Sequence, residues 1–156
     1  MRTTTKWLIT AGLAGVFVLV SGAQTGRDTA GSQKHKPVFM TRLYTGPDGQ
    51  THAEEIEAKF TAAGANEAYK MATTGAELHR AAPGTVIDWH TAPRRQYVIT
   101  LSGQGEVEVS GGKKIHIGPG HIDLVEDTTG KGHITRVLGN EERVTLQLPL
   151  SDQSTR

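Results

Sequence analysis

GTVIDWHTAPRRQYVITLSG, residues 84–103, is the segment of this chain with the strongest structural signal. It contains two runs rich in β-branched and aromatic residues, at positions 85–90 and 96–101, and such runs favour β-strands. Pro93 interrupts the segment between the two runs, and Ser102-Gly103 ends the second run. The segment therefore predicts two strands joined by a short irregular connection.

Side chains alternate between the two faces of a strand, which sorts the residues of this segment into two sets. The set expected to face the interior of a barrel is Asp88, His90, Gln96, Val98 and Thr100. The set expected on the opposite face, as core candidates, is Trp89, Tyr97, Ile99 and Leu101. Two interpretations fit Arg94 and Arg95: one of them clamps a carboxylate or phosphate, or both form a solvated pair at the rim.

Short strand-like runs continue on both sides of this segment. The 156 residues include 19 Gly and 6 Pro, and turn residues of this kind separate the runs. Further strands are predicted at residues 38–44, 76–80, 106–110, 113–117, 122–126, 134–138 and 144–148. Between residues 51 and 75 the pattern leaves helix, strand and loop open. Short strands at regular spacing predict an all-β antiparallel sandwich or barrel.

The composition excludes several classes of function. A formal net charge of +1 gives no basis for a nucleic-acid surface. The sequence contains no cysteine, which excludes disulfides, thiolate metal sites and cysteine nucleophiles. It also lacks a nucleophile-elbow, zinc-protease or nucleotide-binding motif. The partner we expect is a small molecule.

The first residues have the features of a signal peptide, predicted at residues 1–23. Arg2 and Lys6 precede an apolar run from Trp7 to Val20, which is shorter than the roughly 20 residues that a membrane-spanning helix needs. Small residues follow at 21–23, as a signal peptidase requires. We therefore expect a periplasmic or secreted protein with no membrane anchor after cleavage.

The chain after the signal peptide divides into three parts by composition. Residues 24–37 are polar, contain glycine and show no apolar period, which predicts a disordered linker. Residues 38–150 are the expected barrel domain. Residues 151–156 are expected to form a flexible C-terminal tail.

Five residues of the first segment, together with their spacing, resemble the first motif of the cupin superfamily: Gly84, His90, Ala92, Gln96 and Gly103. In the family, Ala92 corresponds to a second histidine and Gln96 to a glutamate. Gly130 and His133 resemble the looser second motif, with Thr128 in place of the family's proline. The resemblance covers residues 38–150.

The resemblance implies a small single-domain bacterial cupin with a degenerate metal-binding motif. The expected fold is a single jelly-roll barrel of antiparallel strands, and because such barrels expose short sheet edges, a homodimer is the expected assembly. The ligand pocket is expected to include His90, Arg95, Gln96 and His133. Since one fold hosts many chemistries, the resemblance does not assign an activity.

Three functions stay open. The first is binding of a small organic ligand, anionic or carbonyl-bearing, in the barrel pocket. The second is a metal-dependent oxygenase, isomerase or lyase that holds one divalent ion, Zn, Fe, Mn or Ni, with His90, Gln96 and His133. The third is metal-free acid–base chemistry with His90 or His133 as the base.

The choice between these functions depends on the ligand set. Gln96 offers a neutral amide oxygen and no compensating charge, so two imidazoles and this amide would hold a divalent ion weakly. Glu126 or Asp127 could supply the missing carboxylate. The simplest expectation for Asp127 is instead to cap its turn by accepting backbone N–H bonds, and His121 is expected in solvent.

Overall fold

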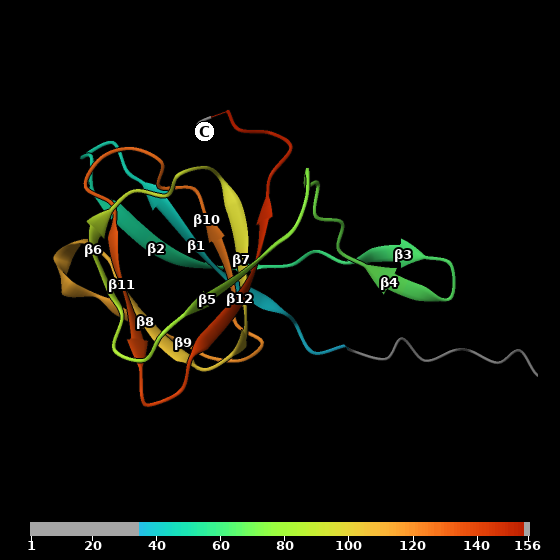
Figure 1. Ribbon diagram of the computed structural model, residues 1–156. Helices are drawn as coiled ribbons and strands as arrows, with labels where there is room; N and C mark the ends of the chain where they lie inside the picture. Colours follow the sequence, from blue (N-terminus) through green and yellow to red (C-terminus); the bar gives the residue numbers. More distant parts are fainter. Residues whose placement is uncertain (1–34, 155–156) are drawn as a thin grey trace, which may run out of the picture. The chain divides into compact units, whose positions relative to one another are not determined.

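The computed structural model describes residues 35–154, which form twelve short strands and one turn of 3₁₀ helix (Figure 1). The strands are β1 Phe39–Thr45, β2 Thr51–Glu57, β3 Thr61–Ala63, β4 Asn66–Ala68, β5 Glu77–Ala81, β6 Val86–His90, β7 Gln96–Ser102, β8 Gln104–Glu108, β9 Lys114–Ile117, β10 Ile122–Val125, β11 His133–Leu138 and β12 Arg143–Pro149. The predicted signal peptide and most of the predicted linker lie outside the described residues. In the described part of the chain, no helix is long and apolar enough to cross a membrane.

Ten of the strands form two sheets that face each other (Figure 1). The larger sheet has the order β2-β1-β10-β7-β12-β5, and the smaller has the order β6-β11-β8-β9. The ladders are antiparallel, except that β1 pairs with β10 in parallel. The predicted all-β class is confirmed, and the two facing sheets form the barrel that the sequence predicts.

The segment that the sequence left open, residues 51–75, contains no helix. Its first part is β2, which pairs along its whole length with β1 through the turn at 46–50. Its second part is the small hairpin of β3 and β4. Thr73 then makes an isolated bridge to Leu150, close to the end of β12.

Apolar side chains pack on both faces of the larger sheet. The cluster between the sheets is Leu43, Ala92, Val107, Val109, Ile117 and Val125. A second cluster on the outer face is Met40, Ala58, Tyr97 and Leu124, with Tyr69, Met71 and Leu150 packed against it. Because adjacent residues such as Leu124 and Val125 point to opposite faces, this one sheet supports both clusters.

Two of the four residues predicted to lie in the core are exposed. Tyr97 is buried as predicted, but Trp89 and Leu101 are exposed to 37% and 47%. Both side chains lie at the surface. The Trp89 ring is contacted there by Lys131, whose Nζ lies 3.8 Å from the ring centroid.

Candidate functional site

A cavity of about 300 Å³ lies between the two sheets. This volume is at the lower end of the range of ligand pockets, about 300–1,000 Å³. Its polar lining consists of His79, His90, Gln96, Asp123, His133, Thr135, Arg143 and Gln147. Its apolar lining consists of Leu43, Ile87, Ala92, Pro93, Val98, Val107, Ile117 and Val125. Such a mixture can hold a small molecule that has both polar and apolar parts.

The cavity is open along one side of the barrel. The strands β5 and β6 are the outer strands of the two sheets at this side. His79 on β5 and Ile87 on β6 both line the cavity, and both are exposed. The lining of the cavity therefore reaches the surface at both strands.

His90 and His133 lie next to each other in the cavity wall. His90 ends β6, His133 begins β11, and the two residues are partners in the antiparallel ladder. Their ring centroids are 4.4 Å apart, with the ring planes inclined by 57°. The two motif histidines, which are far apart in the sequence, thus form one pair inside the barrel.

A glycine allows this close approach. Gly132 has a φ of +77°, which disfavours any other residue, and a Cβ at this position would lie only 2.0 Å from the carbonyl oxygen of His90. The backbone of the chain entering β11 can therefore touch the end of β6. This contact sets His133 opposite His90.

Both imidazole rings have a fixed orientation. His133 Nδ1 lies 2.6 Å from Asp127 Oδ2, and His90 Nδ1 lies 2.8 Å from the backbone carbonyl oxygen of Asp88. A carboxylate or carbonyl oxygen only accepts, so Nδ1 is the donor in both contacts. Within residues 35–154, Nε2 of neither ring has a hydrogen bond. In their neutral form, both rings therefore offer a free Nε2 lone pair.

Asp127 orients His133 from behind instead of capping a turn. Its side chain is fully buried, at 0% exposure, and Oδ2 also accepts a hydrogen bond of 3.0 Å from the Thr51 hydroxyl. The prediction of a turn cap is wrong, because the side chain points inward, toward His133 and Thr51. Sequence analysis named Asp127 but did not give it this role.

The donor set around the histidine pair does not fit a metal ion. Ala92, at the position of the family's second histidine, is buried among apolar side chains and offers no donor. Gln96 is inside the cavity as predicted, but its Oε1 accepts a hydrogen bond of 3.0 Å from Arg94 Nε, which brings a positive charge to this place. Among residues 35–154, no three histidine or carboxylate side chains are arranged to hold a metal ion.

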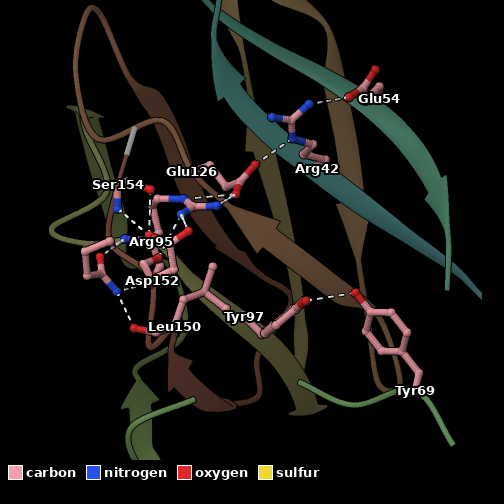
Figure 2. A network of polar contacts seen from close by, with 10 residues as sticks. Arg42, Glu54, Tyr69, Arg95, Tyr97, Glu126, Leu150, Asp152 and Ser154 are labelled. Atoms are coloured by element: carbon pink, nitrogen blue, oxygen red, sulfur yellow. Dashed lines mark hydrogen bonds and ion pairs between the residues drawn. The ribbon is translucent and has the colours of Figure 1, made fainter. Parts of the chain in front are cut away.

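Arg95 does not line the cavity and is not solvated at its rim. The guanidinium is buried on the outer side of the larger sheet and pairs with Glu126, which also accepts a hydrogen bond of 2.6 Å from Arg42 (Figure 2). The physical reason is strand alternation: neighbouring residues of an extended chain point to opposite faces, and Gln96 points into the cavity. Arg94 lies on the side of Gln96 and contacts Glu77 at the surface.

The two arginines of this network, Arg95 and Arg42, stabilise the ionised form of Glu126. Burial alone would raise the pKa of Glu126, but the hydrogen bonds from Arg95 and Arg42 outweigh burial, and the pKa lies below its usual range. The C-terminal segment joins the same network: Gln153 bonds both the backbone N–H and the carbonyl of Arg95. These contacts connect Gln153 to the start of β7; of the tail predicted at residues 151–156, the structure describes residues 151–154.

Sequence analysis missed two charged residues of the cavity, Asp123 and Arg143. Both are buried, at 3% and 8% exposure. Asp123 Oδ1 lies 3.1 Å from Nε2 of His121, and this hydrogen bond raises the pKa of the histidine. His121 is therefore half-buried and paired, which corrects the expectation that it lies in solvent. Arg143 donates a hydrogen bond of 2.8 Å from Nη2 to the Thr100 hydroxyl.

Comparison with known proteins gives distant structural likenesses only. No family model matches the chain, and no curated protein matches it. Similar solved structures include a conserved protein of unknown function from Streptococcus pyogenes, with a TM-score of 0.39 and 15% identity over 50% of this chain and 65% of that one.

Two further similar structures are cupins. An RmlC-like cupin protein from Desulfovibrio desulfuricans has a TM-score of 0.36 and 13% identity over 72% of this chain and 83% of that one. A cupin protein from Bacteroides fragilis has a TM-score of 0.35 and 18% identity over 53% of this chain and 73% of that one. Likenesses at this distance do not assign an activity to this chain.

Proposed function

We propose that the chain binds a small polar organic molecule in the cavity between its two sheets, and that it does so without a metal ion. The observation that carries the proposal is the pair His90 and His133, with Nδ1 of each ring fixed and Nε2 of each ring free at the cavity. Groups that are oriented before binding lose little conformational freedom when a ligand arrives. Two such groups in one small cavity favour a specific ligand.

The chemistry of the pair suggests which ligand groups it would contact. Neutral rings with free Nε2 lone pairs accept hydrogen bonds, so a hydroxyl, amide N–H or carboxylic acid group fits them. The apolar lining, including Val98 and Val107, would cover the hydrocarbon part of the ligand. We also propose that binding takes place outside the cytoplasm, on the basis of the signal-peptide features of residues 1–23.

A ligand screen on metal-free protein tests this proposal. Protein treated with EDTA is heated in the presence of a library of small polar metabolites, because a ligand of the folded state raises the melting temperature by mass action. We expect shifts from compounds that carry hydroxyl or carboxyl groups. If no compound at millimolar concentration raises the melting temperature, the proposal is wrong.

Variants that fill the cavity locate the binding. Thr135→Phe and Val98→Phe each add a bulky side chain to the cavity lining, and both should abolish the shift. Leu101→Phe adds bulk on the exposed outer face of β7 and should leave the shift unchanged. A shift that survives in both cavity-filling variants would contradict binding at this site.

Metal-free proton transfer is a second candidate, and the contact between Asp127 and His133 favours it. A carboxylate that accepts from Nδ1 orients the imidazole and stabilises the imidazolium that forms when Nε2 takes a proton. Incubation of pyruvate with the protein in D₂O, followed by ¹H NMR, detects such a transfer as loss of the methyl signal. We expect faster exchange than in buffer and a loss of at least about tenfold in Asp127→Asn. Equal exchange in the variant would exclude this role.

A further inference from the structure

Arg143, the first residue of β12, is a buried cation in the cavity wall. Its side chain makes few hydrogen bonds within the described residues. Of its five N–H donors, only one on Nη2 is engaged, by the Thr100 hydroxyl. Within residues 35–154, Nε is buried and has no hydrogen-bond partner. A guanidinium in this state is costly, because burial removes hydration that the protein does not replace.

The other arginines show what a structural role would look like. Arg42, Arg80, Arg94, Arg95 and Arg136 each lie within ion-pair distance of a glutamate. Arg143 is the only arginine of the described chain without such a partner, although it is among the most deeply buried. Within residues 35–154, Arg143 therefore lacks the close ion pair that each of the other arginines makes.

The surroundings of Arg143 leave its charge available to a ligand. Asp123 lines the same cavity but makes no ion pair with Arg143 in the part of the chain that the structure describes. Its Oδ1 bonds His121 instead. Burial lowers the pKa of Arg143, and the charge of Asp123, which lies beyond ion-pair distance, opposes this effect only in part. Guanidinium groups keep their proton in proteins.

The position of Arg143 complements the histidine pair. Arg143 contacts Thr100 near the end of β7, whereas Gln96 begins that strand and pairs with Val125, two residues before Asp127. Four residues of extended strand separate these places, which is about 13 Å along β7. One ligand can therefore meet a cation toward one end of the cavity and the two Nε2 atoms toward the other.

We propose that Arg143 binds the carboxylate of the cavity's ligand, which makes the ligand a small carboxylic acid with a second polar group at its far end. The inference rests on the proposed binding function and adds the ligand class and the anchoring residue. A planar guanidinium and a carboxylate match in geometry, and hydrogen bonds between charged groups are the strong ones.

Matched carboxylate and amide probes test the role of Arg143. Benzoate against benzamide, and butyrate against butyramide, are titrated into EDTA-treated protein, with affinity measured from NMR chemical shifts. We expect each carboxylate to bind wild type at least about tenfold more tightly than its amide. Arg143→Met, which keeps the length of the side chain, should remove this preference. Arg80→Met removes an exposed positive charge and should keep it.

Stability gives a second readout that separates binding from a structural role. Replacing a poorly paired buried charge by an apolar side chain removes the cost of keeping that charge out of water. The midpoint of unfolding of Arg143→Met should therefore be equal to or higher than that of wild type. A clearly lower midpoint would mean that Arg143 serves the fold and would count against the inference.

The binding outcomes separate this inference from the proposed function. If amides and carboxylates bind wild type equally, the cavity binds ligands but Arg143 is not an anion anchor. If the preference for carboxylates survives in Arg143→Met, another group selects the carboxylate and the inference is wrong. If no probe of either kind binds, the inference and the binding function both fail for these molecules.

Discussion

The imidazole rings of His90 and His133 lie 4.4 Å apart, centroid to centroid, although they come from different strands and different parts of the sequence. Each ring donates from Nδ1 to an oxygen that can only accept. The pair therefore has defined tautomers as well as a defined position.

Both histidines should exist as the Nδ1–H tautomer when they are neutral. Two-bond ¹H–¹⁵N correlation spectra of ¹⁵N-labelled protein at about pH 8, above the usual histidine range, distinguish protonated from unprotonated ring nitrogens. We expect an unprotonated Nε2 for His90 and His133. In Asp127→Asn the His133 signals should change, while those of His79, whose ring is hydrogen-bonded to Glu77, should not. An Nε2–H tautomer in either cavity histidine would contradict the orientation described above.

Gly132→Ala should unfold the protein much more easily than a glycine substitution elsewhere. A Cβ at position 132 would lie 2.0 Å from the carbonyl oxygen of His90, so β11 and β6 would have to separate. Gly139 has a similar φ of +75° but open space around its Cβ, which makes Gly139→Ala the matched control. Denaturant unfolding should show a loss in Gly132→Ala that exceeds the loss in the control by about 2 kcal/mol or more. Equal losses would mean that the contact between the two strands is not tight.

Removing the carboxylate of Glu126 should strongly destabilise the fold. Glu126 and Arg95 form a buried ion pair, and breaking such a pair by changing one partner costs about 3–5 kcal/mol. Glu54 lies at the exposed end of the same network, so Glu54→Gln should cost less than about 1 kcal/mol. Urea unfolding of Glu126→Gln and Glu54→Gln measures both effects. Similar values for the two variants would contradict the assigned burial.

The same carboxylate makes stability depend on pH in the acid range. The pKa of Glu126 is lower in the folded state than its usual value near 4.3, so the folded state binds its proton less readily than the unfolded state. The contribution of Glu126 to the free energy of unfolding is complete above about pH 5 and is lost as pH falls through the lowered pKa. The difference in unfolding free energy between wild type and Glu126→Gln should therefore shrink below about pH 4. A constant difference would rule out this linkage.

Wild type should bind no stoichiometric metal, and restoring the missing donors should create a site. Ala92→His combined with Gln96→Glu adds an imidazole and a carboxylate beside His90 and His133. Protein purified without a chelator or a histidine tag, then incubated with zinc, iron, nickel or manganese, is assayed by elemental analysis. We expect less than about a tenth of an equivalent in wild type and close to one in the double variant. Adding His90→Ala to the double variant should remove the metal again. Stoichiometric metal in wild type would favour the metal-dependent enzyme.

The strands were predictable because their signals are local. Gly and Pro turns bound the runs, and most predicted strands agree with the structure to within a residue or two. The direction of the Arg95 side chain was also predictable from the sequence. Arg95 is adjacent to Gln96 in an extended chain, so the two side chains face opposite sides. By contrast, nothing local distinguished helix from strand at residues 51–75, where pairing with β1 decides the outcome.

Arg143 shows why part of the cavity lining could not be predicted from the sequence. Along β12, Arg143, Thr145 and Gln147 alternate with Val144 and Leu146, which usually means that the polar face meets water. In this barrel the polar face of the strand meets the cavity, and only the tertiary structure shows that reversal. The predicted homodimer and the predicted export stay predictions.

The most direct test of a binding cavity is to find where a probe lies. Nuclear Overhauser contacts between benzoate and methyl groups of the metal-free protein locate the probe. The account predicts contacts to Val98 and Val107, which line the cavity, and their loss in Thr135→Phe. Contacts only to Leu78 and Leu101, which are exposed on the outer face, would contradict it.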